Sequence, residues 1–232
     1  KADNMGDLMK FAQCFDMKKA QEAAAAQSKT KDDKPAQEGM NRDCIGRDYQ
    51  GPAEFVYPDT AFAYAEATND LNDQYQGDDA IAPVLYPVRP FIKVATDTVM
   101  DSDLNADLLR LVHGEQDMRF YDTIKPWDLI APRATITDIE SKSSGELLQV
   151  TQRLMRDGEV VCETTSGFFI RGSKKSDGPK QEKAAPAPEP ARDITFETTF
   201  NVDDDQSYRY ADASLDHNPI HVNENTAKAA GH

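Results

Sequence analysis

The feature that most restricts the fold is an alternation of apolar and polar residues on both sides of Asp157-Gly158. Leu148, Val150 and Leu154 share one face of the run before this turn, and the run after it alternates in the same way. A period of two is typical of a strand with one buried face, and Asp-Gly is a strong signal for a two-residue hairpin turn. The sequence therefore predicts an antiparallel β-hairpin over residues 146–170.

A helix is predicted before this hairpin. Pro58 suits the first turn of a helix, and Asp59 can cap backbone N–H groups that would otherwise lack a partner. Ala65 and Ala67 continue the pattern, and we expect the helix to end between residues 70 and 73. A helix followed by antiparallel strands indicates an α+β fold. Further apolar residues are expected in the core rather than in a pocket: Tyr86, Pro87, Phe91 and Trp127.

Charge narrows the classes of ligand. The 232 residues include 41 Asp and Glu against 26 Lys and Arg, which gives a formal net charge of -15. Nucleic acids and anionic membranes attract proteins through Lys and Arg, so we expect neither as a partner. An acidic surface of this kind does not steer an anionic ligand toward the protein, so local positive charge would have to hold such a ligand.

Cysteine spacing and hydropathy predict a protein without metal sites in a reducing compartment. Cys14, Cys44 and Cys162 are widely spaced, with no Cys-x-x-Cys pair and no His placed to complete a zinc site. Residues 101–103 lack the Gly and Glu that a calcium loop requires, so we expect a solvated turn there. Without a signal peptide or an apolar run of membrane-spanning length, the chain is predicted to be soluble and intracellular.

Two polar segments predict the domain organisation. Residues 21–44 are rich in Ala, Lys, Asp and Gln and should form a linker after an amphipathic helix within residues 1–20. A proline-rich spacer over residues 173–192 should separate a domain at 45–172 from a shorter one at 193–232.

The shorter segment is predicted to begin with a strand over residues 193–200, followed by a short helix over residues 208–214. A further helical pattern is interrupted at residue 232, and Lys1 is not an initiator Met. We therefore expect the sequence to be cut at both ends from a longer chain.

The run from Asp216 to His221 concentrates the polar groups that can do chemistry. Pro219 disfavours α geometry at Asn218, so a turn there should bring the carboxylate and the imidazole to one space. Asn223 can cap a following helix, which would place His221 just outside a helix N-terminus. A carboxylate and an imidazole can divide general acid and base work near neutral pH. Taken alone, such residues also form ordinary turns.

This run resembles the signature of the MaoC-like hydratases and dehydratases of the hot-dog fold. It reads Tyr210-Ala211-Asp212-Ala213-Ser214-Leu215-Asp216-His217-Asn218-Pro219-Ile220-His221-Val222. The resemblance implies that Asp216 and His221 are the catalytic pair and that Asn218 orients the water or the pair. The implied reaction is reversible syn hydration of trans-2-enoyl-CoA to (R)-3-hydroxyacyl-CoA in fatty-acyl metabolism. Asp216 would activate the water, and His221 would pass a proton to the α-carbon.

Two departures from the family pattern bear on this expectation. Leu215 stands where Gly is common, which can alter the turn. The family's oxyanion-hole N–H group lies in a His-Gly stretch beyond the start of the central helix, and the sequence ends before it. We therefore expect a truncated second hot-dog, holding an acid–base pair without the donor that stabilises the enolate. His217 lies in the same turn and is expected to be exposed.

A degenerate copy of the signature occurs earlier, as Tyr64-Ala65-Glu66-Ala67-Thr68-Asn69-Asp70-Leu71-Asn72, and Asp73-Gln74 follow where Pro-Ile-His would be needed. A second similarity is to the His-Gly-Glu-Gln stretch of the family's N-terminal repeat, as Leu111-Val112-His113-Gly114-Glu115-Gln116-Asp117. Together they imply a double hot-dog whose N-terminal repeat is not catalytic. Asp70 and Asn72 are then expected at a helix end, and His113 as a structural residue at a strand start.

The resemblance also implies partners and alternatives. The partner would be an acyl-CoA or acyl-carrier-protein thioester, with no cofactor besides CoA itself, and hot-dog sheets normally pair as homodimers. The cytoplasm is the expected location, or the peroxisome in a eukaryote. Residues 5–12 resemble the last helix of a sterol-carrier-protein-like lipid-binding domain. The alternatives are a non-catalytic acyl-thioester- or lipid-binding module, a dehydratase acting on carrier-protein thioesters, and a thioesterase.

Overall fold

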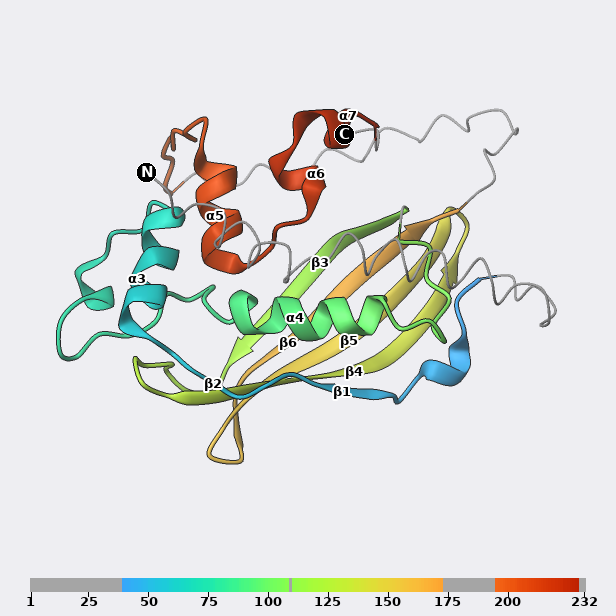
Figure 1. The fold of residues 1–232 in the computed structure, drawn as a ribbon, viewed down its shortest axis with the longest axis horizontal. Helices are drawn as coiled ribbons and strands as arrows, with labels where there is room; N and C mark the ends of the chain where they lie inside the picture. Colours follow the sequence, from blue (N-terminus) through green and yellow to red (C-terminus); the bar gives the residue numbers. More distant parts are fainter. Residues whose placement is uncertain (1–38, 109, 173–194, 230–232) are drawn as a thin grey trace, which may run out of the picture.

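A curved antiparallel sheet wraps around the long helix α4 (Val88–Val99) in the computed structural model (Figure 1). The structure describes residues 39–108, 110–172 and 195–229. We call the described residues up to 172 the first repeat and residues 195–229 the second repeat. The predicted helix within 1–20, most of the 21–44 linker and the whole predicted spacer over 173–192 lie outside the described residues.

The sheet has the strand order β1-β4-β5-β6-β3, and β2 also pairs with β4. All of these pairs are antiparallel. The strands are β1 (Asp48–Gln50), β2 (Glu54–Phe55), β3 (Leu111–Phe120), β4 (Leu129–Lys142), β5 (Gly145–Arg156) and β6 (Glu159–Arg171).

The predicted hairpin is the centre of this sheet. Asp157 and Gly158 connect β5 to β6 with φ of 52° and 89°, the left-handed geometry that a tight hairpin turn requires. Leu148, Val150 and Leu154 are fully buried on the face toward α4, as their alternation indicated. Local alternation and one turn dipeptide therefore place the central strands correctly.

The helices of the first repeat differ from the prediction. Helix α3 (Pro58–Ala67) ends earlier than expected, because Asn69 takes up a left-handed conformation with φ of 56°. A second helix, α4, was not predicted, yet it is the one around which the sheet curves. Its residues Pro90, Phe91, Val94 and Thr98 are buried at helical spacing.

Three of the four residues predicted for the core are buried, and the fourth is exposed. Tyr86 and Phe91 are buried together with Pro87, whereas Trp127 is 63% exposed and has a left-handed φ of 70°. Its ring meets Tyr57 edge-on, with ring centroids 5.7 Å apart. Trp127 therefore lies in a surface turn before β4 rather than in the core.

A buried polar link joins α4 to the sheet. The Gln152 amide on β5 donates to the backbone carbonyl of Phe91 at 3.1 Å and accepts from the Ser166 hydroxyl of β6 at 2.9 Å. Gln152 is only 2% exposed, so these bonds satisfy polar atoms that would otherwise be stranded in the core. They also fix the position of α4 along the strands.

The second repeat contributes helices α5 (Gln206–Ser214), α6 (Pro219–Val222) and α7 (Glu224–Ala229). The predicted helix over 208–214 is confirmed. The predicted strand over 193–200 is wrong for its described residues, since 195–200 have no regular structure and Phe196 and Phe200 are over 80% exposed. A strand needs a neighbour for its backbone hydrogen bonds, and no described strand pairs with this segment.

Two short 3-10 turns complete the described elements, Arg42–Cys44 and Asp73–Tyr75. Among the described helices, none is both long and apolar enough to cross a lipid bilayer.

Candidate active site

The Asp216 turn is held by bonds between its own side chains and backbone. Helix α5 ends at Leu215, which has a left-handed φ of 66°. The buried Ser214 hydroxyl donates to the Tyr210 carbonyl at 2.7 Å and accepts from the Asp216 N–H at 3.2 Å. The Asp216 carboxylate in turn accepts from the Asn218 N–H at 3.2 Å. These local bonds reverse the chain after α5, as the sequence pattern predicts.

Asn218 and Pro219 direct the chain into α6. Asn218 is extended, with ψ of 123°, and its side chain accepts from the Ile220 N–H at 3.3 Å as the N-cap. Proline at the first helical position follows the preference of helix starts. Asn223 then caps α7 by accepting from the Thr226 N–H at 2.9 Å, as predicted.

The turn brings the predicted pair together. The Nε2 atom of His221 lies 3.6 Å from the Oδ2 atom of Asp216, and their side chains are 51% and 28% exposed. His221 lies just before the N-terminus of α7, as predicted, and it also belongs to a separate short helix, α6, which Asn218 caps. His217 is more buried than expected, with 13% of its side chain exposed, and its ring lies 3.9 Å from Asp212.

Helix α5 packs against α3, and their tyrosines meet at the contact. Tyr64 and Tyr210 lie edge to face with centroids 5.7 Å apart, and their hydroxyls are within 3.1 Å. Burial is the larger cause, and the Tyr210 hydrogen bond the next, of the raised pKa of Tyr64. Figure 1 shows α5 beside α3 and above the end of α4.

The degenerate copy keeps the geometry of the turn. Asn69 and Leu215 occupy the same position after their tyrosines and are both left-handed. Asn72 accepts from the N–H two residues later at 3.1 Å, as Asn218 does in the second repeat. The expectation that Asp70 and Asn72 are helix-end groups is consistent with these contacts, since Asn72 caps the turn Asp73–Tyr75.

Tyr75 takes the place of the histidine in the copy. Its hydroxyl donates to Asp70 at 2.8 Å, where His221 faces Asp216 in the second repeat. Tyr75 is 5% exposed, and burial first, then the Asp70 bond, raises the pKa of its hydroxyl. The first repeat therefore presents a buried tyrosine beside an exposed carboxylate, where the second repeat has an imidazole and a carboxylate.

His113 packs near the start of a strand, as the sequence predicts. It stands near the start of β3, where a register shift separates it from Glu115, and its ring stacks on Phe168 at 4.8 Å. Loss of hydration lowers the pKa of His113, although part of the residue stays exposed. The backbone of Glu115 and the charge of Asp216 act in the opposite direction. The charge of Asp216 is the smallest of these three effects on the pKa of His113.

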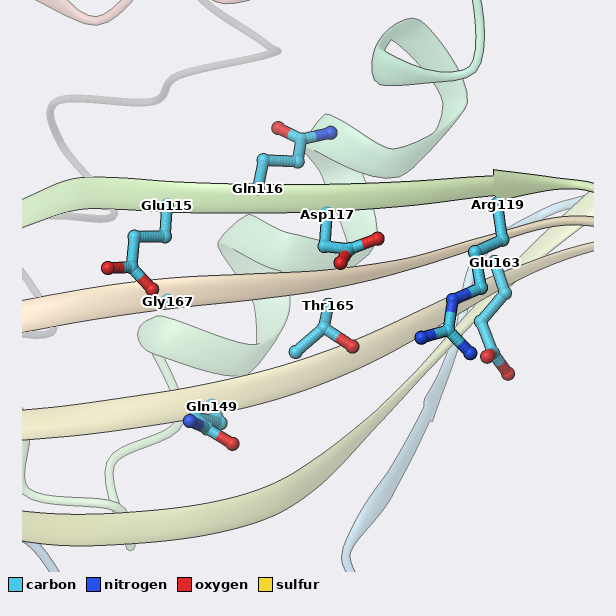
Figure 2. A pocket seen from close by; sticks show the side chains of 8 residues that line it. All are labelled: Glu115, Gln116, Asp117, Arg119, Gln149, Glu163, Thr165 and Gly167. Atoms are coloured by element: carbon cyan, nitrogen blue, oxygen red, sulfur yellow. The ribbon is translucent and has the colours of Figure 1, made fainter. Parts of the chain in front are cut away.

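A hollow of about 480 Å³ lies elsewhere, on the outer face of the sheet (Figure 2). The register places Glu115, Asp117 and Thr165 on the face opposite to the buried Ser166. The lining residues are Glu115, Gln116, Asp117, Arg119, Gln149, Glu163, Thr165 and Gly167. It contains none of the predicted site residues, and its carboxylates would repel an anionic thioester. The turn therefore stays the better candidate.

The described residues contain no group of three or more His, Cys, Asp or Glu side chains that could hold a metal ion. In the same part of the chain, Cys44 and Cys162 are free and buried. Burial, with a smaller effect from Glu163, raises the pKa of the Cys162 thiol to about 12. These thiols are packing residues rather than nucleophiles.

Comparison with known proteins decides the family. Residues 65–172 match the model of the MFE-2 hydratase 2 N-terminal domain, and residues 183–232 match that of the MaoC like domain. The chain belongs to the MaoC-like hot-dog family. The degenerate copy and the intact signature thus fall in two different domains of this family, and the family indicates a hydratase or dehydratase.

Two relatives match more than half of this MaoC-like protein. A UPF0336 protein of Thermobifida fusca is 29% identical over 148 residues, which are 59% of this chain and 97% of that protein. A probable enoyl-CoA hydratase 2 of Dictyostelium discoideum is 25% identical over 167 residues, 68% of this chain and 55% of that protein.

A solved structure confirms the fold. The crystal structure of a MaoC-like dehydratase from Phytophthora capsici has a TM-score of 0.65 and 22% identity, covering 83% of this chain and 70% of that chain. The predicted α+β hot-dog class is therefore correct for this MaoC-like protein. Sequence reasoning missed α4 and Tyr75.

Proposed function

We propose that this protein catalyses the reversible hydration of trans-2-enoyl-CoA to (R)-3-hydroxyacyl-CoA, with Asp216 and His221 as the acid–base pair. The observation that carries the proposal is the 3.6 Å approach of His221 Nε2 to Asp216 Oδ2 in a turn built to hold both. The matches to hydratase and dehydratase domains support the reaction class.

The two groups can account for every proton in the reaction. Asp216 removes a proton from water as its oxygen bonds to the β-carbon, and protonated His221 gives a proton to the α-carbon. The pair then resets when the proton on Asp216 returns to His221, and their 3.6 Å separation allows this with a small movement. Asn218 shapes the turn through its cap to Ile220 and lies next to the attacking water in this scheme.

Single substitutions in the pair test the proposal with crotonyl-CoA as substrate. We expect Asp216→Ala and His221→Ala each to lower kcat by about 100-fold to 10,000-fold, the usual contribution of general acid–base groups. Asp212→Ala is the matched control, because Asp212 is an exposed carboxylate of the neighbouring helix turn that faces His217. Its kcat should stay near the unsubstituted value. If all three variants hydrate crotonyl-CoA at the unsubstituted rate, Asp216 and His221 are not the acid–base pair.

A binding module for acyl thioesters is the second candidate. The exposure of half the His221 side chain favours it, because catalytic electrostatics act best where water is excluded. Three readouts with crotonyl-CoA separate the possibilities. Loss of the conjugated enoyl absorbance without free thiol indicates hydration, release of thiol indicates a thioesterase, and binding without either change indicates a module. The same assay with a carrier-protein thioester compares the two forms of substrate.

A further inference from the structure

Arg89, on the central helix of the non-catalytic repeat, reaches the end of the helix that precedes Asp216. Its Nη1 atom donates to the backbone carbonyl of Ala213 at 2.7 Å. Ala213 lies in the last turn of α5, two residues before the left-handed Leu215 and three before Asp216. The bond therefore links α4 of one repeat to the catalytic turn of the other.

The last carbonyls of a helix lack partners within it and carry partial negative charge. Helix α5 has no basic residue in its own last turn, so Arg89 supplies the cation from outside. Arg89 is itself part-buried, near Glu54 and Tyr86. Burial raises the pKa of Glu54, and the positive charge of Arg89 partly offsets this effect. The guanidinium therefore reaches Ala213 from a half-buried position on α4.

A similar bond is made in the opposite direction, from the second repeat to the equivalent backbone carbonyl of the first. Ala67 occupies the same position after Tyr64 as Ala213 does after Tyr210, and its carbonyl accepts from the Gln206 amide at 3.3 Å. Each turn is thus anchored by a side chain of the other repeat. The anchor on the catalytic turn is charged and shorter, as charge-assisted bonds are.

We propose that Arg89 is a positioning residue for Asp216, through which the non-catalytic repeat sets the geometry of the catalytic turn. Arg89 does not touch the reacting atoms. It fixes the end of α5, and the local bonds of Ser214 and Asn218 carry that position to the carboxylate. The inference rests on the proposed hydratase activity.

Hydration kinetics of Arg89→Met and Arg89→Lys in the full-length protein test this role. The methionine keeps the apolar stem and removes the donor. We expect its kcat to fall about tenfold to a hundredfold, the cost of misplacing a catalytic group by about 1 Å, with KM nearly unchanged. Lysine still offers one N–H donor at similar reach, so its kcat should be intermediate. If the methionine variant does not fold, the lysine variant alone carries the kinetic test.

Arg209→Met is the matched control. Arg209 also crosses between the repeats, donating to the Glu66 carbonyl and the Asn69 side chain at 3.2 Å, but from the first half of α5. Its loss weakens the same repeat contact without touching the catalytic turn, so kcat should change less than about threefold. Equal losses of kcat in both variants, an unchanged kcat in Arg89→Met, or a change confined to KM would overturn the positioning role.

Amide hydrogen exchange over residues 213–218 gives a readout that does not need activity. Exchange there should be faster in Arg89→Met than in Arg209→Met, because only the first loses the anchor of this turn. If the unsubstituted protein does not hydrate crotonyl-CoA but this difference is seen, the positioning role stands and the proposed function fails. If exchange is the same in both variants, the positioning role fails whatever the activity.

Discussion

At the scale of single residues, Leu215 is the strained position of the turn that precedes Asp216. Its φ of 66° is unfavourable for a side chain with a Cβ atom, and most unfavourable for a β-branched one. We expect Leu215→Val to lower the free energy of unfolding by about 1–2 kcal/mol. Leu215→Gly should stay within about 1 kcal/mol of the unsubstituted protein, since relief of strain is offset by greater freedom of the unfolded chain.

Urea unfolding of both variants measures this difference. Leu71→Val makes the same exchange at a 63% exposed position without positive φ, and should change the free energy of unfolding by less than about 0.5 kcal/mol. If Leu215→Val lowers the free energy of unfolding no more than Leu71→Val does, residue 215 is not left-handed in solution.

Residues of the site could be predicted from the sequence where their geometry is local. The contacts of Asp216, Asn218 and His221 span only two to five positions of the chain, and Pro219 favours the turn between them. Arg89 could not be found in this way, because its partner Ala213 is 124 positions away and depends on the packing of two repeats.

At the scale of elements, Gln152 is the link that seats α4 on the sheet. Gln152→Ala leaves the Phe91 carbonyl and the Ser166 hydroxyl without this buried partner and also opens a cavity. We expect it to lower the free energy of unfolding by about 2–4 kcal/mol. Gln149→Ala, on the outer face of the same strand, is the control and should cost less than about 1 kcal/mol. Thermal or urea unfolding measures both variants. If they lose similar free energies of unfolding, Gln152 does not form a stabilising buried link.

Elements were predictable where periodicity is uninterrupted. The β5–β6 hairpin combines strict alternation with Asp157-Gly158, so two independent local signals agree. Helix α4 was missed because prolines at positions 83, 87 and 90 suggest a loop, although proline is tolerated in a first helical turn. Phe91, Val94 and Thr98 are spaced three and four positions apart, and this spacing is the sequence signal that could have revealed the helix. All three are buried in the structure.

At the scale of the whole molecule, stability in acid depends on where carboxylates are paired. The edge strand β1 is tied to the loop after α4 by Asp101, which accepts from Arg47 at 2.6 Å and from the Tyr49 hydroxyl at 2.7 Å. Burial alone would raise the pKa of Asp101, but the bonds from Tyr49 and Arg47 outweigh it and hold the pKa below its usual 3.8. Arg47 therefore stabilises the turn at residues 101–103, which the sequence predicted as a solvated turn.

The lowered pKa fixes the sign of the pH effect. Asp101 stabilises the fold above its unfolded-state pKa, and this contribution is lost as pH falls below about 4 through the lower folded-state value. We expect Asp101→Asn to lower the free energy of unfolding by about 1 kcal/mol at pH 7, a figure reduced for partial solvent screening. Urea unfolding from pH 7 to 3 should show this deficit shrinking at the acid end.

Asp103→Asn is the control, because Asp103 is a 63% exposed partner of Arg47. Its deficit in the free energy of unfolding should be smaller than that of Asp101→Asn at every pH. A deficit for Asp101→Asn that stayed constant down to pH 3 would mean that its ionised form does not brace the strand.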